Sequence, residues 1–92
     1  MSQEPLPDPY LLDVLVCPIT KQPLSVANSE VVDRLNRAIE GDAIQTNGGE
    51  AVTTTVPHAL ITRNGTMIYR IESGLPVLLE EQGITSIQLD GW

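Results

Sequence analysis

Cysteine and histidine, the soft metal ligands, are nearly absent from this chain of 92 residues, which has one of each, Cys17 and His58. A structural zinc site needs four ligands, usually two Cys-x-x-Cys pairs, and here Thr20 stands where the second cysteine of a pair would be. Two soft ligands cannot complete a tetrahedron, so we expect no metal and no cofactor. A single cysteine also excludes a disulfide within the chain and favours a cytoplasmic location.

Aromatic residues are scarce as well, with no Phe, one Trp and two Tyr. The core must therefore be built from Leu, Ile and Val. This length suits one small domain, so we expect a single domain over residues 1–92.

Basic residues and long apolar runs are also lacking. Five basic against twelve acidic residues give a net charge of −7, which repels phosphate backbones and argues against direct nucleic-acid binding. No apolar stretch approaches the roughly 18 residues of a membrane span. The acidity serves either solubility or complementarity to a basic partner. The second interpretation draws on the stretch from Glu72 to Trp92, which holds four acids and no Lys or Arg.

No catalytic constellation is recognisable. Cys17 and His58 have no motif around them, and the chain has neither a phosphate-binding glycine loop nor a serine nucleophile elbow. The alternative of a small enzyme with Cys17 as nucleophile would need a setting that lowers the thiol pKa. We therefore expect a protein that is not an enzyme and has no catalytic residues.

The first half of the chain predicts two helices. Residues 1–7 read as a flexible lead-in, and Asp8-Pro9 is a favourable helix start, so a short helix is expected over 9–15. A short strand follows over 24–26. The second helix begins at Ser29 and stops at Gly41.

The second half predicts a hairpin. Residues 42–58 give no clear signal, although 52–56 has strand composition. Two β-rich runs, 59–63 and 66–71, flank Asn64-Gly65, which favours a two-residue type I′ turn. The resulting register puts Leu60 opposite Tyr69. One face then holds Leu60, Met67, Tyr69 and Ile71 and is expected to pack on the helices. The other holds Ile61 and Ile68, with Arg63 and Arg70, and is either covered by the second helix, which we favour, or a partner surface.

Two blocks together resemble a known family. The run from Leu11 to Leu24 is similar to a Leu-Leu-x-x-Leu-x-Cys-Pro-x-x-Lys-x-x-Leu signature, and the segments from Leu60 to Ile71 and from Gly74 to Leu79 are similar to a closing Tyr-Pro-Ile-x-x-Gly-Ile-Pro-Val-Leu-Leu block. The order and spacing of these blocks resemble the tRNA-methyltransferase activator subunits of eukaryotes and archaea and their short bacterial YcaR-type relatives.

The resemblance implies an α+β fold, in which a small antiparallel sheet of zinc-ribbon-like type carries an N-terminal helix and an inserted helix. Residues 27–57 correspond to a helical insertion. The metal positions of the family fall on Cys17, Thr20, Thr62 and Gly65, so only one ligand survives. The fold is therefore expected to be metal-free.

The resemblance also implies a non-catalytic accessory subunit that stabilises or activates a methyltransferase. Family members pair by β-strand addition and by covering an apolar patch. The partner-binding residues would be Tyr69, Ile71, Leu75, Pro76 and Leu78. In an alternative interpretation the run Leu75 to Leu79 is simply core, above all Val77 and Leu79. A second alternative is a self-associating structural domain that forms a homodimer and has no methyltransferase partner.

Overall fold

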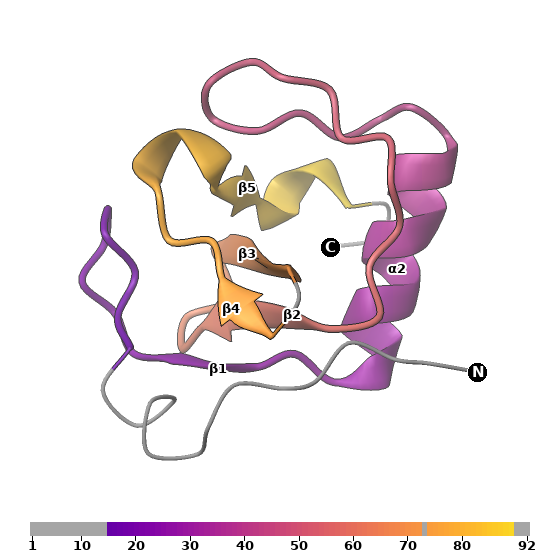
Figure 1. Cartoon of the computed structure of the whole chain (residues 1–92). Coiled ribbons are helices and arrows are strands. Elements are labelled where there is room, and N and C mark those ends of the chain that lie inside the picture. The colour runs from indigo at the N-terminus through magenta and orange to yellow at the C-terminus, as the bar shows by residue number, and fades with distance from the viewer. Residues whose placement is uncertain (1–14, 73, 90–92) are drawn as a thin grey trace.

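The structure is a computed structural model that describes residues 15–72 and 74–89. The expected lead-in over 1–7 lies outside these residues, and so does all but the last residue of the helix expected over 9–15. The described part is an α+β fold, as expected: one helix, α2, packs on a small antiparallel sheet (Figure 1). Its elements are β1 (Leu24–Val26), α2 (Ser29–Glu40), β2 (Ala59–Thr62), β3 (Met67–Glu72), β4 (Leu75–Pro76) and β5 (Ile84–Thr85), with short 3-10 helices η1 (Glu80–Gln82) and η2 (Ser86–Gln88).

The sheet is arranged around β3. Strand order is β1-β2-β3-β4, and β5 also pairs with β3. The last residues of β3 pair with β4 and its first residues pair with β5, so both short strands lie along the same edge of β3. β3 is therefore the centre of the fold and is buried along nearly its whole length.

Helix α2 forms where the sequence predicts it. The side chain of Asn28 caps its start by accepting a hydrogen bond of 2.9 Å from the N–H of Val31. Gly41 ends it, with its N–H on the carbonyl of Arg37. Arg34 bonds Glu30 at 3.1 Å across one helical turn of the exposed face.

The β2–β3 hairpin has the predicted register, with Leu60 opposite Tyr69. The predicted type I′ turn is wrong, because that turn needs positive φ at both central residues. Gly65 has a φ of 73°, but Asn64 is not among the described residues with positive φ. The N–H of Gly65 donates to the carbonyl of Thr62 at 2.9 Å, so the reversal spans 62–65. The left-handed Gly65 then leads into β3 and restores the same register.

Two apolar clusters lie on opposite faces of the sheet. The first cluster joins α2 to Ile68, which confirms that the helix covers the face holding Ile61 and Ile68. Its buried members are Ala27, Val32, Leu35, Ile39, Ile44, Val52, Ala59, Ile68, Ile84 and Leu89. The second holds Cys17, Leu24, Leu60, Met67, Tyr69 and Ile71, with Leu15 and Leu78 against it. The Tyr69 face therefore does not pack on α2, contrary to expectation. The turn that follows Leu15 and the chain after β4 cover it instead.

Two stretches of the second half are now assigned. Residues 52–56, whose composition suits a strand, form none, and Val52 alone of them is fully buried, at 3 % exposure. The apolar run that begins at Leu75 is strand only as far as Pro76. Leu79, which one interpretation placed in the core, is 55 % exposed. No helix in the described residues is long and apolar enough to cross a membrane.

Candidate functional site

The turn at residues 17–22 is closed by hydrogen bonds to the sulfur and backbone of Cys17. The N–H of Thr20 points at the Sγ of Cys17 from 3.4 Å, and the N–H of Lys21 bonds the carbonyl of Cys17 at 2.9 Å. The N–H of Cys17 in turn bonds the carbonyl of Gln22 at 2.9 Å. Lys21 takes a φ of 61°, a left-handed conformation that closes the turn. The loop is thus held by its own hydrogen bonds.

At the β2–β3 turn, the hydroxyl of Thr62 is fully hydrogen-bonded. The Oγ1 of Thr62 accepts from the N–H groups of Thr66 and Met67 at 3.1 and 3.2 Å and donates to the Oδ1 of Asn64 at 2.8 Å. The described residues hold no group of three His, Cys, Asp or Glu side chains that could bind a metal. A zinc ion does not fit this donor set, because Gly65 brings no side chain and the oxygen of Thr62 is already fully bonded.

Cys17 is buried and hydrogen-bonded to the central strand. Its Sγ lies 2.8 Å from the hydroxyl oxygen of Tyr69, and both residues are fully buried. Burial raises the pKa of the Cys17 thiol, but hydrogen bonds from Thr20 and Tyr69 outweigh it and hold the pKa below its ordinary value. Burial, the bond to Cys17 and the charge of Glu80 raise the pKa of Tyr69 well above its usual range. In this contact either the phenol or the thiol can be the donor, and the phenol is the donor once the thiol has ionised.

The five predicted partner-binding residues divide into two layers. Leu75 is 68 % exposed, and Pro76 and Leu78 are half-buried. Tyr69 and Ile71 are buried, at 0 % and 1 % exposure, in the cluster beneath Leu78. Only the first three reach the surface. Tyr69 and Ile71 lie beneath Leu78, whereas Leu75 pairs with Glu72, on the opposite face of β3 from Tyr69 and Ile71.

The outer edge of β4 is poorly suited to strand addition. The N–H of Val77 donates to the carbonyl of Arg70 at 3.0 Å, so the backbone groups of residues 75 and 77 face β3. Those of Pro76 face away, and proline has no N–H to donate. A strand added at this edge would miss a hydrogen bond, whereas the exposed side chains remain available for contact.

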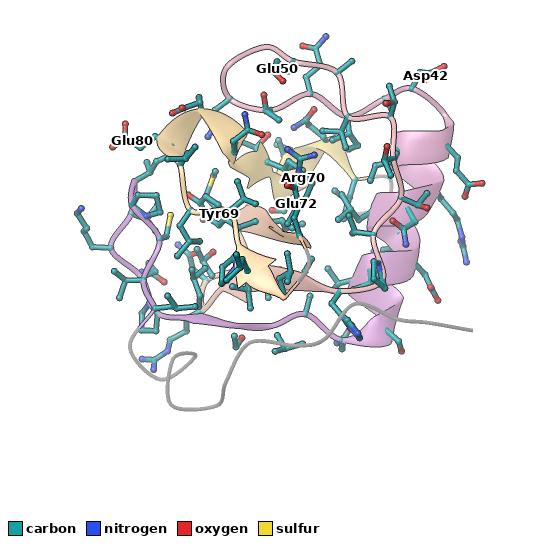
Figure 2. All side chains as sticks on the ribbon, viewed as in Figure 1. Asp42, Glu50, Tyr69, Arg70, Glu72 and Glu80 are labelled. Atoms are coloured by element: carbon teal, nitrogen blue, oxygen red, sulfur yellow. The ribbon has the colours of Figure 1, made fainter. Side chains whose placement is uncertain are left out.

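The segment after β4 is braced by the turn at residues 46–50. The N–H of Gly48 bonds the carbonyl of Glu81, and the N–H of Asn47 bonds that of Gly83, both at 2.9 Å. The side chain of Asn47 also reaches the carbonyl of Glu80 at 3.2 Å. With the backbone fixed in this way, η1 presents its acidic side chains at the edge of the molecule, as Glu80 shows in Figure 2.

Ile19 lies close to these acids. It lines one shallow hollow of about 440 Å³ with Asn47, Glu80 and Glu81, and it is 45 % exposed. We define the contact patch as the exposed residues Leu75, Leu79, Glu80 and Glu81, which follow one another along the chain, together with Ile19 of this hollow. The sequence prediction included Leu75, whereas it favoured a core position for Leu79. It also missed that the turn at 17–21 and η1 come together, because this contact depends on the long loop between α2 and β2.

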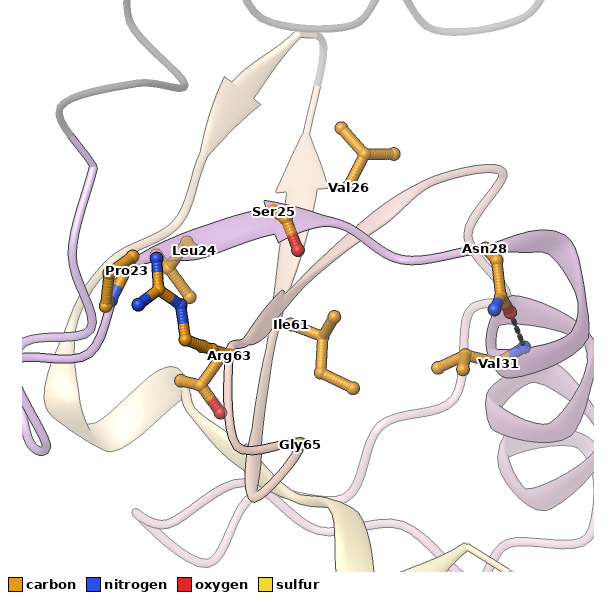
Figure 3. Close-up of a pocket in the computed structure, with 10 residues that line it drawn as sticks. Pro23, Leu24, Ser25, Val26, Asn28, Val31, Ile61, Arg63 and Gly65 are labelled. Atoms are coloured by element: carbon orange, nitrogen blue, oxygen red, sulfur yellow. Dashed lines mark hydrogen bonds between the residues drawn. The ribbon is translucent and has the colours of Figure 1, made fainter.

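A second hollow, of about 630 Å³, opens between β1, β2 and the start of α2 (Figure 3). Ser25, Ile61 and Arg63 line it, together with Asn28, whose side-chain oxygen already caps the helix. Nothing in the sequence pattern predicted this hollow. Its lining contains one cation and no carboxylate, and no catalytic grouping is found there.

Comparisons with known proteins agree with the fold. The family described as Trm112p-like protein matches residues 8–74. A UPF0434 protein from Hyphomonas neptunium is 31 % identical over 75 residues, which are 82 % of this chain and 56 % of that protein. The chain thus spans little more than half the length of this curated relative. A protein from Xylella fastidiosa solved by solution NMR is 40 % identical, with a TM-score of 0.74 over 90 % of this chain and 86 % of that one.

Proposed function

This chain belongs to the Trm112p-like family, and from that membership we propose that it is a cytoplasmic, non-catalytic accessory subunit that binds a protein partner. The family is one of accessory and activator proteins, so the proposed partner is a methyltransferase that the subunit stabilises or activates. Binding is proposed to use Leu75, Pro76 and Leu78, extended by the rest of the contact patch.

The observation that carries this proposal is the exposure of leucines beside a well-packed core. Leu75 and Leu79 are 68 % and 55 % exposed, within five residues of each other along the chain. Neighbouring exposed apolar side chains on a small protein are typical of interaction sites. Tyr69 and Ile71 act from below, because they hold Leu78 and the following segment in place.

The geometry favours cover by a partner's side chains over pairing of strands. Pro76 removes the donor that strand addition at β4 would use. The same feature weighs against the alternative of a homodimer joined edge to edge through β4. A partner that binds the leucines in an apolar groove needs no hydrogen bond from residue 76.

Affinity capture tests the proposal. The tagged chain, a Leu75→Ser/Leu79→Ser variant and a control Ile87→Ser variant would be used as baits in the native lysate. Ile87 is 83 % exposed and lies outside the contact patch. The control therefore also replaces an exposed apolar side chain with serine, but at a different place on the surface. We expect a methyltransferase in near-stoichiometric amount with the wild type and the control, and loss of about tenfold or more with the double variant.

The reconstituted pair then tests activation. Methyl transfer by the recovered enzyme should rise, or its thermal half-life lengthen, when the subunit is added. Recovery of the bait alone, eluting as a dimer on a sizing column, would replace this proposal with the self-associating structural domain.

A further inference from the structure

We propose that the partner's docking surface is basic, with Lys or Arg side chains surrounding an apolar centre that receives Leu75 and Leu79. This inference rests on the proposed function and specifies the chemistry of the partner. It follows from where the charges lie relative to the exposed leucines.

The leucines of the contact patch are bordered by carboxylates. Glu80 and Glu81 directly follow Leu79, and both are exposed. Glu72 is exposed and pairs across the sheet with Leu75. Acids therefore lie at both ends of the exposed apolar run, in the arrangement of a polar rim around an apolar centre.

Most basic side chains of the chain lie elsewhere. Arg34 and Arg37 are on α2 and Arg63 is in the β2–β3 turn. Arg70 keeps its charge beside Glu72, because its partner, the side chain of Gln82, is neutral. Lys21, in the turn beside Ile19, is the second nearby cation, so the three carboxylates of Glu72, Glu80 and Glu81 outnumber two cations.

The acids are held in position rather than trailing from a loose loop. The carbonyl groups of Glu80 and Glu81 are bonded by Asn47 and Gly48, which fixes the backbone of η1. The Cβ of Glu81 is so close to Gly48 that a Cβ added there would lie 3.0 Å from it. Preorganised charges of this kind steer a complementary surface and lose little freedom on binding.

Charge also excludes other occupants. A second copy of the chain would bring its own net charge of −7 and set carboxylates against carboxylates in a symmetric contact. Nucleic acid is repelled for the same reason. A basic protein surface is the occupant that both the leucines and the glutamates fit.

The experiment uses the full chain and the protein that it captures, identified by mass spectrometry and then purified. Affinity is measured by titration at 0.1 M and 1 M salt for the wild type, for Glu80→Gln/Glu81→Gln and for Asp33→Asn/Glu40→Gln. The last variant is the matched control, because it changes the charge equally at exposed positions of α2. The Debye length falls from about 10 Å to about 3 Å over this salt range.

We expect Glu80→Gln/Glu81→Gln to weaken binding about tenfold at 0.1 M salt and less than twofold at 1 M, mainly through a slower association rate. The control should differ from wild type by less than twofold at both concentrations. If Leu75→Ser/Leu79→Ser abolishes binding but the glutamine variant binds normally, the basic surface is excluded and the proposed function stands. If the leucine variant also binds normally, or no partner is captured, both proposals fail.

Discussion

The hydroxyl of Tyr69 lies 2.8 Å from the sulfur of Cys17, across 52 residues of sequence. This contact joins the centre of β3 to the turn that precedes β1, and both groups are shielded from water. A buried phenol and a buried thiol each need a hydrogen-bond partner, so the contact links the two parts of the fold.

Tyr69→Phe should raise the pKa of Cys17, because the phenol donates one of the hydrogen bonds that lower it. Absorbance of the thiolate near 240 nm, followed during a pH titration, measures this directly. The variant should also lose about 1 kcal/mol of unfolding free energy, the usual net contribution of one buried hydrogen bond. An unchanged thiol titration would mean that the Tyr69 hydroxyl does not contribute to the lowered pKa of Cys17.

The same pair makes stability depend on pH. Folding lowers the pKa of Cys17, so the unfolded chain binds this proton more tightly and stability rises with pH toward the ordinary thiol value of about 8.5. Folding raises the pKa of Tyr69, so stability falls again when the pH passes the ordinary tyrosine value of about 10. In Tyr69→Phe, denaturant titrations across pH 7 to 11 should show a smaller rise and no fall from this residue.

Local signals in the sequence were enough for α2 and for the hairpin register. The spacing of Val32, Leu35 and Ile39 marks one buried face of a helix, and these residues are buried together. Asn64-Gly65 located the reversal, but the turn type depends on the hydrogen bonds of Thr62 to its neighbours. Such a network depends on where each hydroxyl points, which composition does not reveal.

The candidate site was only half predictable. The run from Leu75 to Leu79 was identified as a contact segment, but the alternation of a strand does not apply beyond Pro76, where the strand ends. The exposure of Leu79 therefore could not be derived from the two-residue periodicity of a strand. The contact of Asn47 and Gly48 with η1 joins segments more than thirty residues apart, and no local pattern encodes it.

Leu35→Ala should destabilise the fold strongly. Leu35 is fully buried at the centre of the cluster between α2 and the sheet, and removing it leaves a cavity, at a cost of about 2–5 kcal/mol. Ile87→Ala is the matched control and should cost less than about 0.5 kcal/mol, since Ile87 is 83 % exposed. Urea unfolding followed by circular dichroism distinguishes them. Equal losses would contradict the placement of α2.

Gly83→Ala should destabilise by overpacking. A Cβ at Gly83 would lie 2.7 Å from the Cε of Met67 and 3.0 Å from the Nδ2 of Asn47, and such crowding costs about 1–3 kcal/mol. Gly41→Ala is the control, because its added Cβ finds no atom nearer than 3.5 Å. Met67→Leu in the Gly83→Ala background removes the nearest atom and should recover part of the loss. No recovery would place the strain at Asn47 instead.

Leu75→Asp and Leu78→Asp should separate partner binding from folding. Leu78 packs against the cluster around Tyr69, so a carboxylate there is placed against apolar side chains and should lower the unfolding free energy by about 2 kcal/mol or more. Leu75 is 68 % exposed, so its replacement should change stability by less than about 0.5 kcal/mol.

Both variants should lose partner capture, but only Leu75→Asp does so with an intact fold, because a charge would enter the apolar centre of the proposed contact without disturbing the core. Thermal unfolding and affinity capture on the same preparations give the two readouts. A Leu75→Asp variant that unfolds would assign Leu75 to the core, and one that captures normally would remove it from the contact patch.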